Sequence, residues 1–453
     1  MNTTANLGKA PVRTLVLQLA IPSMTAQFVN VLYSIIDRMY IGHISENGAL
    51  ALAGAGICGP IVTLLTSFGT LVGIGGSITM GIRMGEKNHK KAEQVLANSF
   101  LMLSIFSVLL TVSFLLLKDK LLMLFGASGA TFPFANTYLT IYTTGTFFAL
   151  MATGLNYFIN CQGFPLVGMF TVPIGAGCNI LSDPIFIFGF HMGIAGAAWA
   201  TVIGQIVSGI MVILYLRKFK TVDLTLKRLK PHPHYIGRIV SLGMAPFFNQ
   251  VSMMVVQIVM NNVLIRYGAK SSYGSDIPLA CAGIITKINM IFFSINIGIS
   301  QGLQPIISYN YGAKKLDRVR EAYLKAAISA TIISTVSFIC FQLFPRQIIG
   351  IFGSESEAYF RFAEKFFRIF LFCTFINGLQ PITANFFTAI GKANRGIFLS
   401  LTRQVIFLLP LMIILPIFFG IEGVMFSAPI ADGFAAVCAI TFAVKELKSF
   451  QKL

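Results

Sequence analysis

The sequence predicts an all-α membrane protein with twelve transmembrane helices in two six-helix lobes, and three observations support this fold class. Apolar residues make up 55% of the 453 residues and charged residues only 11%, with a mean hydropathy of +0.78. Apolar runs long enough to cross a bilayer recur along the whole chain. The second half of the chain repeats short motifs of the first half in the same order.

Each apolar run is expected to form a helix. The runs are continuous and lack the strict apolar–polar alternation of a membrane β-barrel strand, so helices are the remaining way to satisfy the backbone in lipid. The predicted helices cover residues 14–40, 49–82, 93–117, 134–159, 166–190, 194–216, 236–266, 277–309, 320–344, 364–390, 395–419 and 421–444.

The internal repeat divides these helices into two equal sets. For example, "LAIPSM" (19–24) matches "GMAPFF" (243–248), and "GEKNHKKAEQV" (85–95) matches "GAKKLDRVREA" (312–322). Because six is an even number, both halves enter the membrane in the same orientation, as in transporters whose repeats are related by an axis along the membrane normal. The predicted domains are an N-terminal lobe, a cytoplasmic linker and a C-terminal lobe, at residues 13–220, 221–236 and 237–445.

The net charge of +18 follows from the membrane topology. Most of the 34 Lys and Arg residues fall on one side of the predicted membrane, in clusters such as "RMGEKNHKK" (83–91) and "GAKKLDRVRE" (312–321). Since cytoplasmic loops carry an excess of Lys and Arg, both termini are expected in the cytoplasm. The lipid bilayer is therefore the expected partner, and no nucleic acid is needed to explain the charge.

Cysteines and histidines give no sign of a metal site or cofactor. The seven cysteines lie in or beside apolar runs without CxxC spacing, and the five histidines are scattered. The cysteines are interpreted as small core residues rather than as disulfides or metal ligands, and no metal site is expected at the histidines. No cofactor is expected beyond a coupling ion.

Two aspartates lie within apolar runs of the first half. Asp37 is in "SIIDRMYIG", and Asp183 is followed by a proline in "CNILSDPIFIFGF" (178–190). A buried carboxylate is unfavourable by several kcal/mol unless it is paired, so an intramembrane acid indicates a functional site. In the second half, Asp183 aligns with Pro410 and Asp37 aligns with Asn261 or Asn262, so neither acid has an acidic counterpart.

The two acids are expected to meet a nearby amide and hydroxyl. Counting from the outer turns, Asp37 and Thr201 lie roughly 8 Å deep and Asp183 roughly 9 Å deep, while Asn179 shares a helix face with Asp183. Two carboxylates a few Å apart in a low dielectric cannot both stay ionised, so they would hold a proton or share Na⁺. The alternative is that each Asp is a satisfied polar group bonded to neighbouring helices.

Further residues are candidates for the wall of a substrate cleft, although structural roles explain them about as well. Gln304 precedes a proline in "GLQPI" (302–306), where a helix kink is the alternative. Lys287 can also extend its charge out of the membrane, and methionines on the seventh helix can pack in the core. Asp432 is assigned a structural role. The residues proposed for the cleft are Gln304, Lys287, Met253, Gln257 and Asn261.

At "IIDRMYIG" and "DPIFIFG", together with the basic loops after the second and eighth helices, the chain resembles the MATE family (multidrug and toxic compound extrusion) in its bacterial DinF/MepA-like branch. The resemblance implies a V-shaped central cleft and cation-coupled antiport that exports amphipathic, often cationic drugs. It places the coupling site at Asp37, Asn179, Asp183 and Thr201, with Pro22 at a bend in the first helix.

One departure from the family favours a coupling site in the first lobe. NorM-like members carry an acid on the seventh helix, where this chain reads "FFNQVS" with Asn249 and Gln250. The expected protein is a non-enzymatic, monomeric transporter in the bacterial inner membrane. Two alternatives are weaker. A flippase for lipid-linked oligosaccharides would show several intramembrane cations beyond Lys287 and Arg403, and an intramembrane aspartyl protease would carry a GxGD motif.

Overall fold

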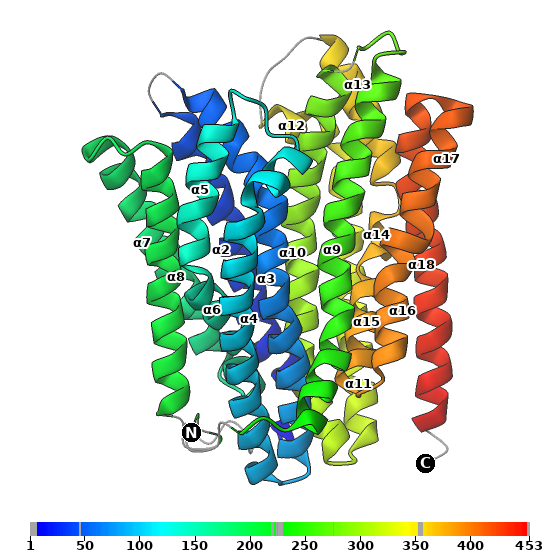
Figure 1. Ribbon diagram of the computed structural model, residues 1–453. Coiled ribbons are helices and arrows are strands. Elements are labelled where there is room, and N and C mark those ends of the chain that lie inside the picture. Colours follow the sequence, from blue (N-terminus) through cyan, green and yellow to red (C-terminus); the bar gives the residue numbers. More distant parts are fainter. Residues whose placement is uncertain are drawn as a thin grey trace.

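The computed structural model describes residues 7–44, 47–218, 222, 224, 230–274, 276–351 and 357–450. All regular structure in these ranges is helical. The helices stand side by side, and α2 begins at the same end of the bundle at which α18 ends (Figure 1). This end is called the terminal end below. Much of the predicted linker 221–236 lies outside the described residues, and α9 already begins within it at Pro233.

Each half of the chain supplies six membrane spans. The first half comprises α2 Val12–Gly42, α3 Gly48–Gly85, α4 His89–Leu124, α5 Phe132–Thr144 with α6 Thr146–Cys161, α7 Pro165–Pro184 with the π-helix η1 Ile185–Gly189, and α8 Ile194–Arg217. The second half comprises α9 Pro233–Gly268, α10 Asp276–Gly312, α11 Leu316–Leu343, the short α12 Pro345–Gly350, α13 Glu357–Phe370 with α14 Thr374–Asn377 and α15 Leu379–Ala389, α16 Ala393–Leu401 with the π-helix η3 Thr402–Leu408 and α17 Leu409–Phe419, and α18 Ile421–Phe450.

Two of the twelve predicted helices are broken, in equivalent spans of the two halves. Ten spans of the described chain are continuous and apolar enough to cross a membrane, and α13 with α14–α15 forms a span bent by 44°. In the first half, α5 and α6 are separated only by Gly145. Beside each break a threonine hydroxyl donates to a carbonyl, Thr146 to Thr143 and Thr374 to Leu371, both at 2.7 Å. Such bonds make a break tolerable within the membrane.

The backbone repeats between the halves in detail. Residues in the left-handed region, which favours glycine, occur at equivalent loop positions. The equivalent pairs, with their φ angles, are Lys87 (61°) with Lys314 (59°), Gly163 (87°) with Gly391 (79°), and Gly193 (55°) with Gly420 (59°). The two-lobe fold class predicted from the sequence is confirmed.

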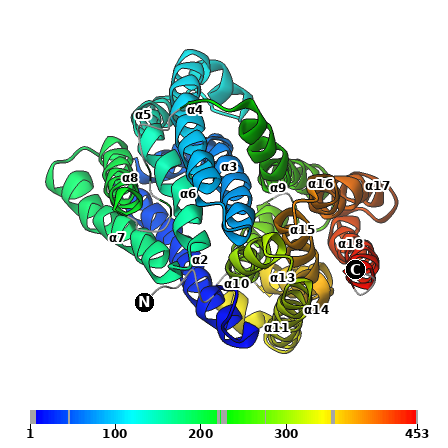
Figure 2. The ribbon, with the colours of Figure 1, turned by 90° about the horizontal axis from the view of Figure 1, so that it is seen from below.

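The first helix of each half is shared between both lobes. In α2, Leu15 and Leu19 pack in a core whose other residues come mostly from the C-terminal lobe, whereas Ile41 packs in a core of the N-terminal lobe. Correspondingly, Ile239 of α9 packs with the N-terminal lobe and Met260 with the C-terminal lobe. Seen from the terminal end, α2 runs out beside α10 and α11, and α9 starts beside α3 and α4 (Figure 2). The predicted domains assign each of α2 and α9 to a single lobe. Packing instead places one half of each of these two helices in the core of the opposite lobe.

The lobes meet at the terminal end through glycine contacts with backbone. A methyl group built on Gly85 would lie 2.0 Å from the carbonyl oxygen of Tyr309, and one on Gly312 would lie 2.1 Å from that of Ile82. These two contacts are equivalent under the repeat. Gly75 approaches the Ile239 carbonyl in the same way. Only glycine permits backbones to approach this closely, so the lobes are tightly closed at this end.

Candidate functional site

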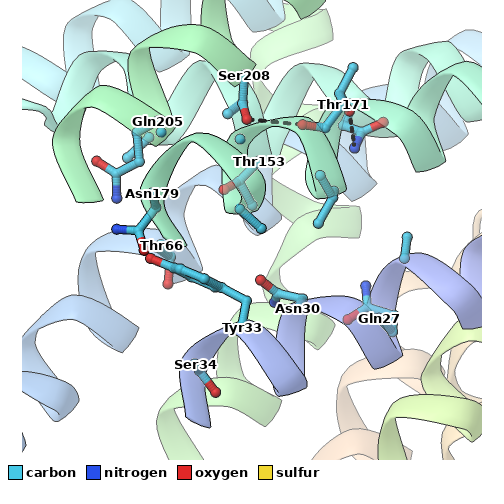
Figure 3. A pocket seen from close by; sticks show the side chains of 18 of the residues that line it. Gln27, Asn30, Tyr33, Ser34, Thr66, Thr153, Thr171, Asn179, Gln205 and Ser208 are labelled. Carbon is cyan, nitrogen blue, oxygen red and sulfur yellow. Dashed lines mark hydrogen bonds between the residues drawn. The ribbon is translucent and has the colours of Figure 1, made fainter. Parts of the chain in front are cut away.

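A cavity of about 550 Å³ lies mainly within the N-terminal lobe. Its wall comes from α2, α3, α5, α6, α7 and α8, and the C-terminal lobe adds Gln250, Ile297 and Gln301. Tyr33 of α2 reaches towards Asn179 of α7 across this space (Figure 3). The cavity therefore reaches from the interior of one lobe to the interface between both lobes.

The two predicted acids are buried at or beside this cavity, and three of their four carboxylate oxygens have no hydrogen-bond partner. Asp37 lines the cavity from α2, is 8% exposed, and its Oδ1 has no partner. Asp183 is fully buried, and neither of its carboxylate oxygens has a partner. The two residues lie close enough for their charges to interact. The free oxygens of Asp183 differ from the alternative interpretation, in which each carboxylate is bonded to neighbouring helices, and the role of both acids stays a prediction.

Local backbone structure explains the position of Asp183. Pro184, which follows it, has no backbone N–H and ends the regular α-helical bonding of α7. The next five residues form the π-helix η1, a wider turn of a kind that is frequent at functional sites. The equivalent span of the second half also contains a π-helix, η3, but carries no acid at this position.

Asn179 and Thr201 complete the predicted group. Asn179 Nδ2 donates to Thr201 Oγ1 at 3.2 Å, and the Thr201 hydroxyl donates to the Ala197 carbonyl at 3.0 Å. Tyr33 lies near Thr201 and within the electrostatic range of both aspartates. The structure thus brings the four predicted residues together around Tyr33, and their role in coupling stays a prediction.

The chemistry of this group suits a proton or a small hard cation. Its free groups are carboxylate oxygens and the Oδ1 of Asn179, and these are acceptors for a proton and ligands for an ion such as Na⁺. The described part of the chain contains no cluster of three or more His, Cys, Asp or Glu side chains.

The buried charge of the second lobe is arranged differently. Asp432 accepts a hydrogen bond from Arg403 Nε at 2.5 Å, and both side chains are buried. The guanidinium also lies over the Phe293 ring, 5.2 Å from its centroid. Arg403 and Asp432 neutralise each other, which fits the structural role assigned to Asp432.

The residues predicted to line a substrate cleft do not line this cavity. Gln304 is buried and donates to Ser77 Oγ at 2.7 Å across the lobe interface. Gln257 bonds to Asn261 at 3.0 Å along α9. Lys287 and Met253 have exposed side chains elsewhere. Contact of these five residues with a substrate stays a prediction.

Sequence reasoning missed most of the cavity wall, which is rich in neutral polar groups. One signal was available, because Gln27, Asn30 and Ser34 share a face of α2 with Arg38 at helical spacing. A polar stripe of this kind is unusual on an otherwise apolar span. The remaining polar groups on the wall that the sequence did not indicate are Ser23, Thr63, Thr66, Thr70, Thr153, Asn156, Asn160, Thr171, Gln205, Ser208, Gln250, Gln301 and the tyrosines 33, 138, 142 and 157.

Comparison with known proteins places the chain in a family. The family model MatE matches residues 22–185 and 247–414, one segment in each half. The multidrug export protein MepA of Staphylococcus aureus (strain N315) is 25% identical over 436 residues, covering 95% of this chain and 93% of the relative. MepA of Staphylococcus haemolyticus (strain JCSC1435) is 26% identical over 431 residues, covering 95% and 92%.

Solved structures share the fold. An outward-facing multidrug resistance MATE family transporter of the MOP superfamily superimposes with a TM-score of 0.92 at 22% identity, covering 100% of this chain and 99% of that one. A MATE structure in the bent conformation gives 0.90 at 22% identity, covering 99% and 98%. These matches confirm the resemblance seen in the sequence. The chain belongs to the MATE family, in its MepA-like branch, and is a multi-pass membrane transporter.

Proposed function

We propose that this protein is an antiporter that exports amphipathic, often cationic organic compounds and draws its energy from inward movement of H⁺ or Na⁺. The observation that carries the proposal is the pair of buried carboxylates, Asp37 and Asp183, with three unpartnered oxygens, beside a cavity large enough for a small organic molecule. The similarity to staphylococcal multidrug export proteins supports the substrate class.

The position of Asp37 couples the ion to the substrate. Asp37 lines the cavity, so its charge contributes to the potential that an organic cation experiences there. A proton or Na⁺ that binds between Asp37 and Asp183 neutralises this charge and weakens the hold on the substrate. The two positive charges therefore compete for one carboxylate pair, which is the requirement for exchange.

Helix α2 transmits the change to the other lobe. Its outer half carries Asp37 in the N-terminal lobe, and its inner half is packed in the C-terminal core. Pro22 lies between these halves, where a missing backbone hydrogen bond lets the helix bend. Neutralising Asp37 thus changes the bend of α2 and, through it, how the two lobes are positioned relative to each other.

The closed terminal end corresponds to a cytoplasmic seal. The basic loops at this end support a cytoplasmic location for it, in a transporter of the bacterial inner membrane. Each chain contains both lobes and a complete carboxylate pair, so a monomer is the proposed functional unit. A flippase would need several intramembrane cations, and of the two candidates, Lys287 and Arg403, Arg403 is already paired with Asp432.

Ethidium uptake into everted membrane vesicles tests the proposal. An imposed gradient of pH or of Na⁺, applied separately, should drive accumulation, and one pH unit supplies ~1.4 kcal/mol to an electroneutral exchange. Transport that follows only one gradient identifies the ion. Accumulation that is the same without either gradient would refute cation coupling.

A further inference from the structure

Gln301 on α10 connects the two halves of the chain beside the cavity. Gln27 Nε2 on α2 donates to Gln301 Oε1 at 3.0 Å, and Gln301 Nε2 donates to the Tyr157 hydroxyl on α6 at 3.2 Å. These links do not depend on how the amides are turned, because amides and a phenol hydroxyl can each donate and accept. One side chain of the second half therefore holds two helices of the first half.

The same three side chains are accessible at the wall of the cavity. Gln27, Tyr157 and Gln301 all line it, and each is partly exposed rather than buried. The net contribution of a neutral hydrogen bond is small, because its two groups can bond to other partners instead. A polar ligand in the cavity can therefore take over the hydrogen bonds of Gln301, and in doing so it breaks the links between the two halves.

These links form the layer of the lobe interface that lies next to the cavity. Further towards the terminal end, Gln304 on α10 bonds to Ser77 on α3 at 2.7 Å, and Gly312 packs against the Ile82 carbonyl. Gln304 and Ser77 are buried and do not line the cavity. Gln301 thus belongs to the part of the closed interface that a ligand in the cavity can reach.

Gln250 on α9 makes a further polar contact in this layer. It bonds to Thr70 on α3 at 3.3 Å, and both residues line the cavity. Among the described side chains, Gln250 has this one bond to the other half, whereas Gln301 has two. The larger share of the closure in this layer is therefore assigned to Gln301.

We propose that Gln301 is a positioning residue that keeps the terminal end closed, and that a polar ligand in the cavity releases this end by taking over the hydrogen bonds of Gln301 with Gln27 and Tyr157. This inference rests on the proposed function, because it takes the cavity as the substrate site. A ligand shifts a conformational equilibrium only if it interacts differently with the two states. Here the difference arises because Gln301 can bond to the first half of the chain or to the ligand, but not to both.

Such a release is useful to an exchanger. If the terminal end opened with no ligand bound, the protein could change its facing without carrying anything, and the coupling ion would move without export. Links that are broken by a ligand keep the closed arrangement favoured until the cavity is occupied. By linkage, opening of the terminal end also strengthens the binding of the ligand.

Distances between spin labels at the terminal end test the inference. The labels are placed at Lys90→Cys and Asp317→Cys, exposed positions in the two lobes of the full-length protein, after the native cysteines are replaced. The ligand probe is ethidium, whose amino groups can bond to an amide. Saturating ethidium should lengthen the distance between the labels. An unchanged distance would overturn the inference.

Gln301→Met should open the terminal end without a ligand. Methionine keeps the approximate size of the side chain but removes both links, so the ratio of open to closed molecules should rise about tenfold. Ethidium should then add little further opening. If the variant kept the parent distance, or if ethidium lengthened it as much as in the parent, the ligand would act through other contacts and the inference would fail.

Matched variants separate the hydrogen bonds from packing. Tyr157→Phe removes a single hydroxyl and should open the terminal end about threefold. Gln27→Met/Gln301→Met should open it no further than Gln301→Met, because the bond between these two residues is already lost. Effects of the two single substitutions that simply add would indicate packing and contradict the proposal. The control is Gln342→Met, which removes a bond to the Arg368 carbonyl within the second half and should change nothing.

The label distances are measured without an ion gradient, which separates this inference from the proposed function. If ethidium and Gln301→Met both open the terminal end but vesicles show no gradient-driven uptake, the role of Gln301 stands and the coupling proposal fails. If uptake follows a gradient but neither opens the terminal end, coupling stands and the role inferred for Gln301 fails.

Discussion

At the scale of single residues, the molecule contains two kinds of buried acid with opposite consequences. Asp183 is fully buried and neither of its oxygens has a partner, whereas Asp432 is bonded to Arg403. An unpartnered buried carboxylate is unfavourable unless it takes up a proton or a cation. A carboxylate paired with arginine already has its charge balanced. The first is suited to exchange an ion, and the second to hold helices together.

Asp183→Asn should abolish uphill dye export while leaving the protein folded. The substitution keeps the shape of the side chain but removes the charge that an incoming ion neutralises. Because it also removes an unpaired buried charge, the melting temperature in detergent should be unchanged or higher. Gradient-driven ethidium uptake and thermal unfolding of the same preparation check both expectations.

The matched control is Asp119→Asn, an equivalent change at an exposed aspartate of α4. It should export like the parent protein. Normal uphill export by Asp183→Asn would remove this residue from the coupling mechanism.

Asp432→Asn, in contrast to Asp183→Asn, should destabilise the protein. It leaves the Arg403 guanidinium buried and without its counter-charge, and breaking a buried pair in this way costs about 3–5 kcal/mol. Thermal unfolding measures the loss. The double substitution Arg403→Met/Asp432→Leu removes both charges and should recover much of the stability. A stable single variant would show that the pair contributes little.

The acids could be predicted from the sequence, whereas most of the cavity could not. Asp37 and Asp183 stand out because a charge in an apolar run is rare, and Asn179 and Thr201 follow from helix geometry. Amides such as Asn156 and Gln250 are unremarkable on a span until the fold brings them to the wall of one cavity. That information depends on tertiary contacts, such as those with Gly168 and Thr70.

At the scale of elements, the predicted spans agree with the helices where hydropathy alone decides. Runs such as 14–40 and 194–216 correspond to α2 and α8, which are slightly longer. The breaks in 134–159 and 364–390 were not predicted, because Thr146 and Thr374 are ordinary residues until their hydroxyls bond to carbonyls beside the break. Hydropathy also could not predict that α2 packs in both lobes, because both halves of this helix are similarly apolar.

Pro22→Ala should stabilise the protein and slow its coupled transport. Alanine restores a backbone N–H that can donate to the Gln18 carbonyl, and an interior proline disfavours a helix by about 3 kcal/mol. A stiffer α2 bends less when Asp37 is neutralised, so less of the movement reaches the C-terminal lobe. A higher melting temperature with a slower gradient-driven uptake is the expected pair of measurements.

Pro246→Ala on α9 is the control that the repeat provides. Pro246 is equivalent to Pro22, but α9 carries no acid in its outer half. Its substitution should therefore affect coupling less than that of Pro22. A larger loss of uphill transport in Pro246→Ala would place the moving helix in the second half.

At the scale of the whole molecule, the two lobes are alike in backbone and different in charge. The repeat and the distribution of Lys and Arg made the arrangement of twelve spans predictable. How the lobes close against each other was not predictable, because a glycine in a span gives no sign of which backbone it approaches. The role of Gly85 and Gly312 becomes clear only from the structure, in which they pack against the backbone carbonyls of Tyr309 and Ile82.

A methyl group at Gly85 or Gly312 should push the lobes apart at the terminal end. Alanine at Gly85 would lie 2.0 Å from a backbone oxygen, which cannot rotate away as a side chain can. Overpacking of this kind costs about 1–3 kcal/mol, and ~1.4 kcal/mol shifts a two-state equilibrium tenfold. The closed arrangement should therefore lose population, and export should slow because this end no longer seals.

Spin labels at Lys90→Cys and Asp317→Cys, exposed positions near the terminal end in the two lobes, can measure the change after the native cysteines are replaced. Gly85→Ala and Gly312→Ala should both lengthen the distance between the labels, since the repeat makes their contacts equivalent. Gly283→Ala on α10 meets no atom within 4 Å and should leave the distance as it was. A methyl group cannot occupy the space of a carbonyl oxygen. If Gly85→Ala and Gly312→Ala kept the label distance of the parent protein, the lobes would therefore have to close through contacts other than these glycines.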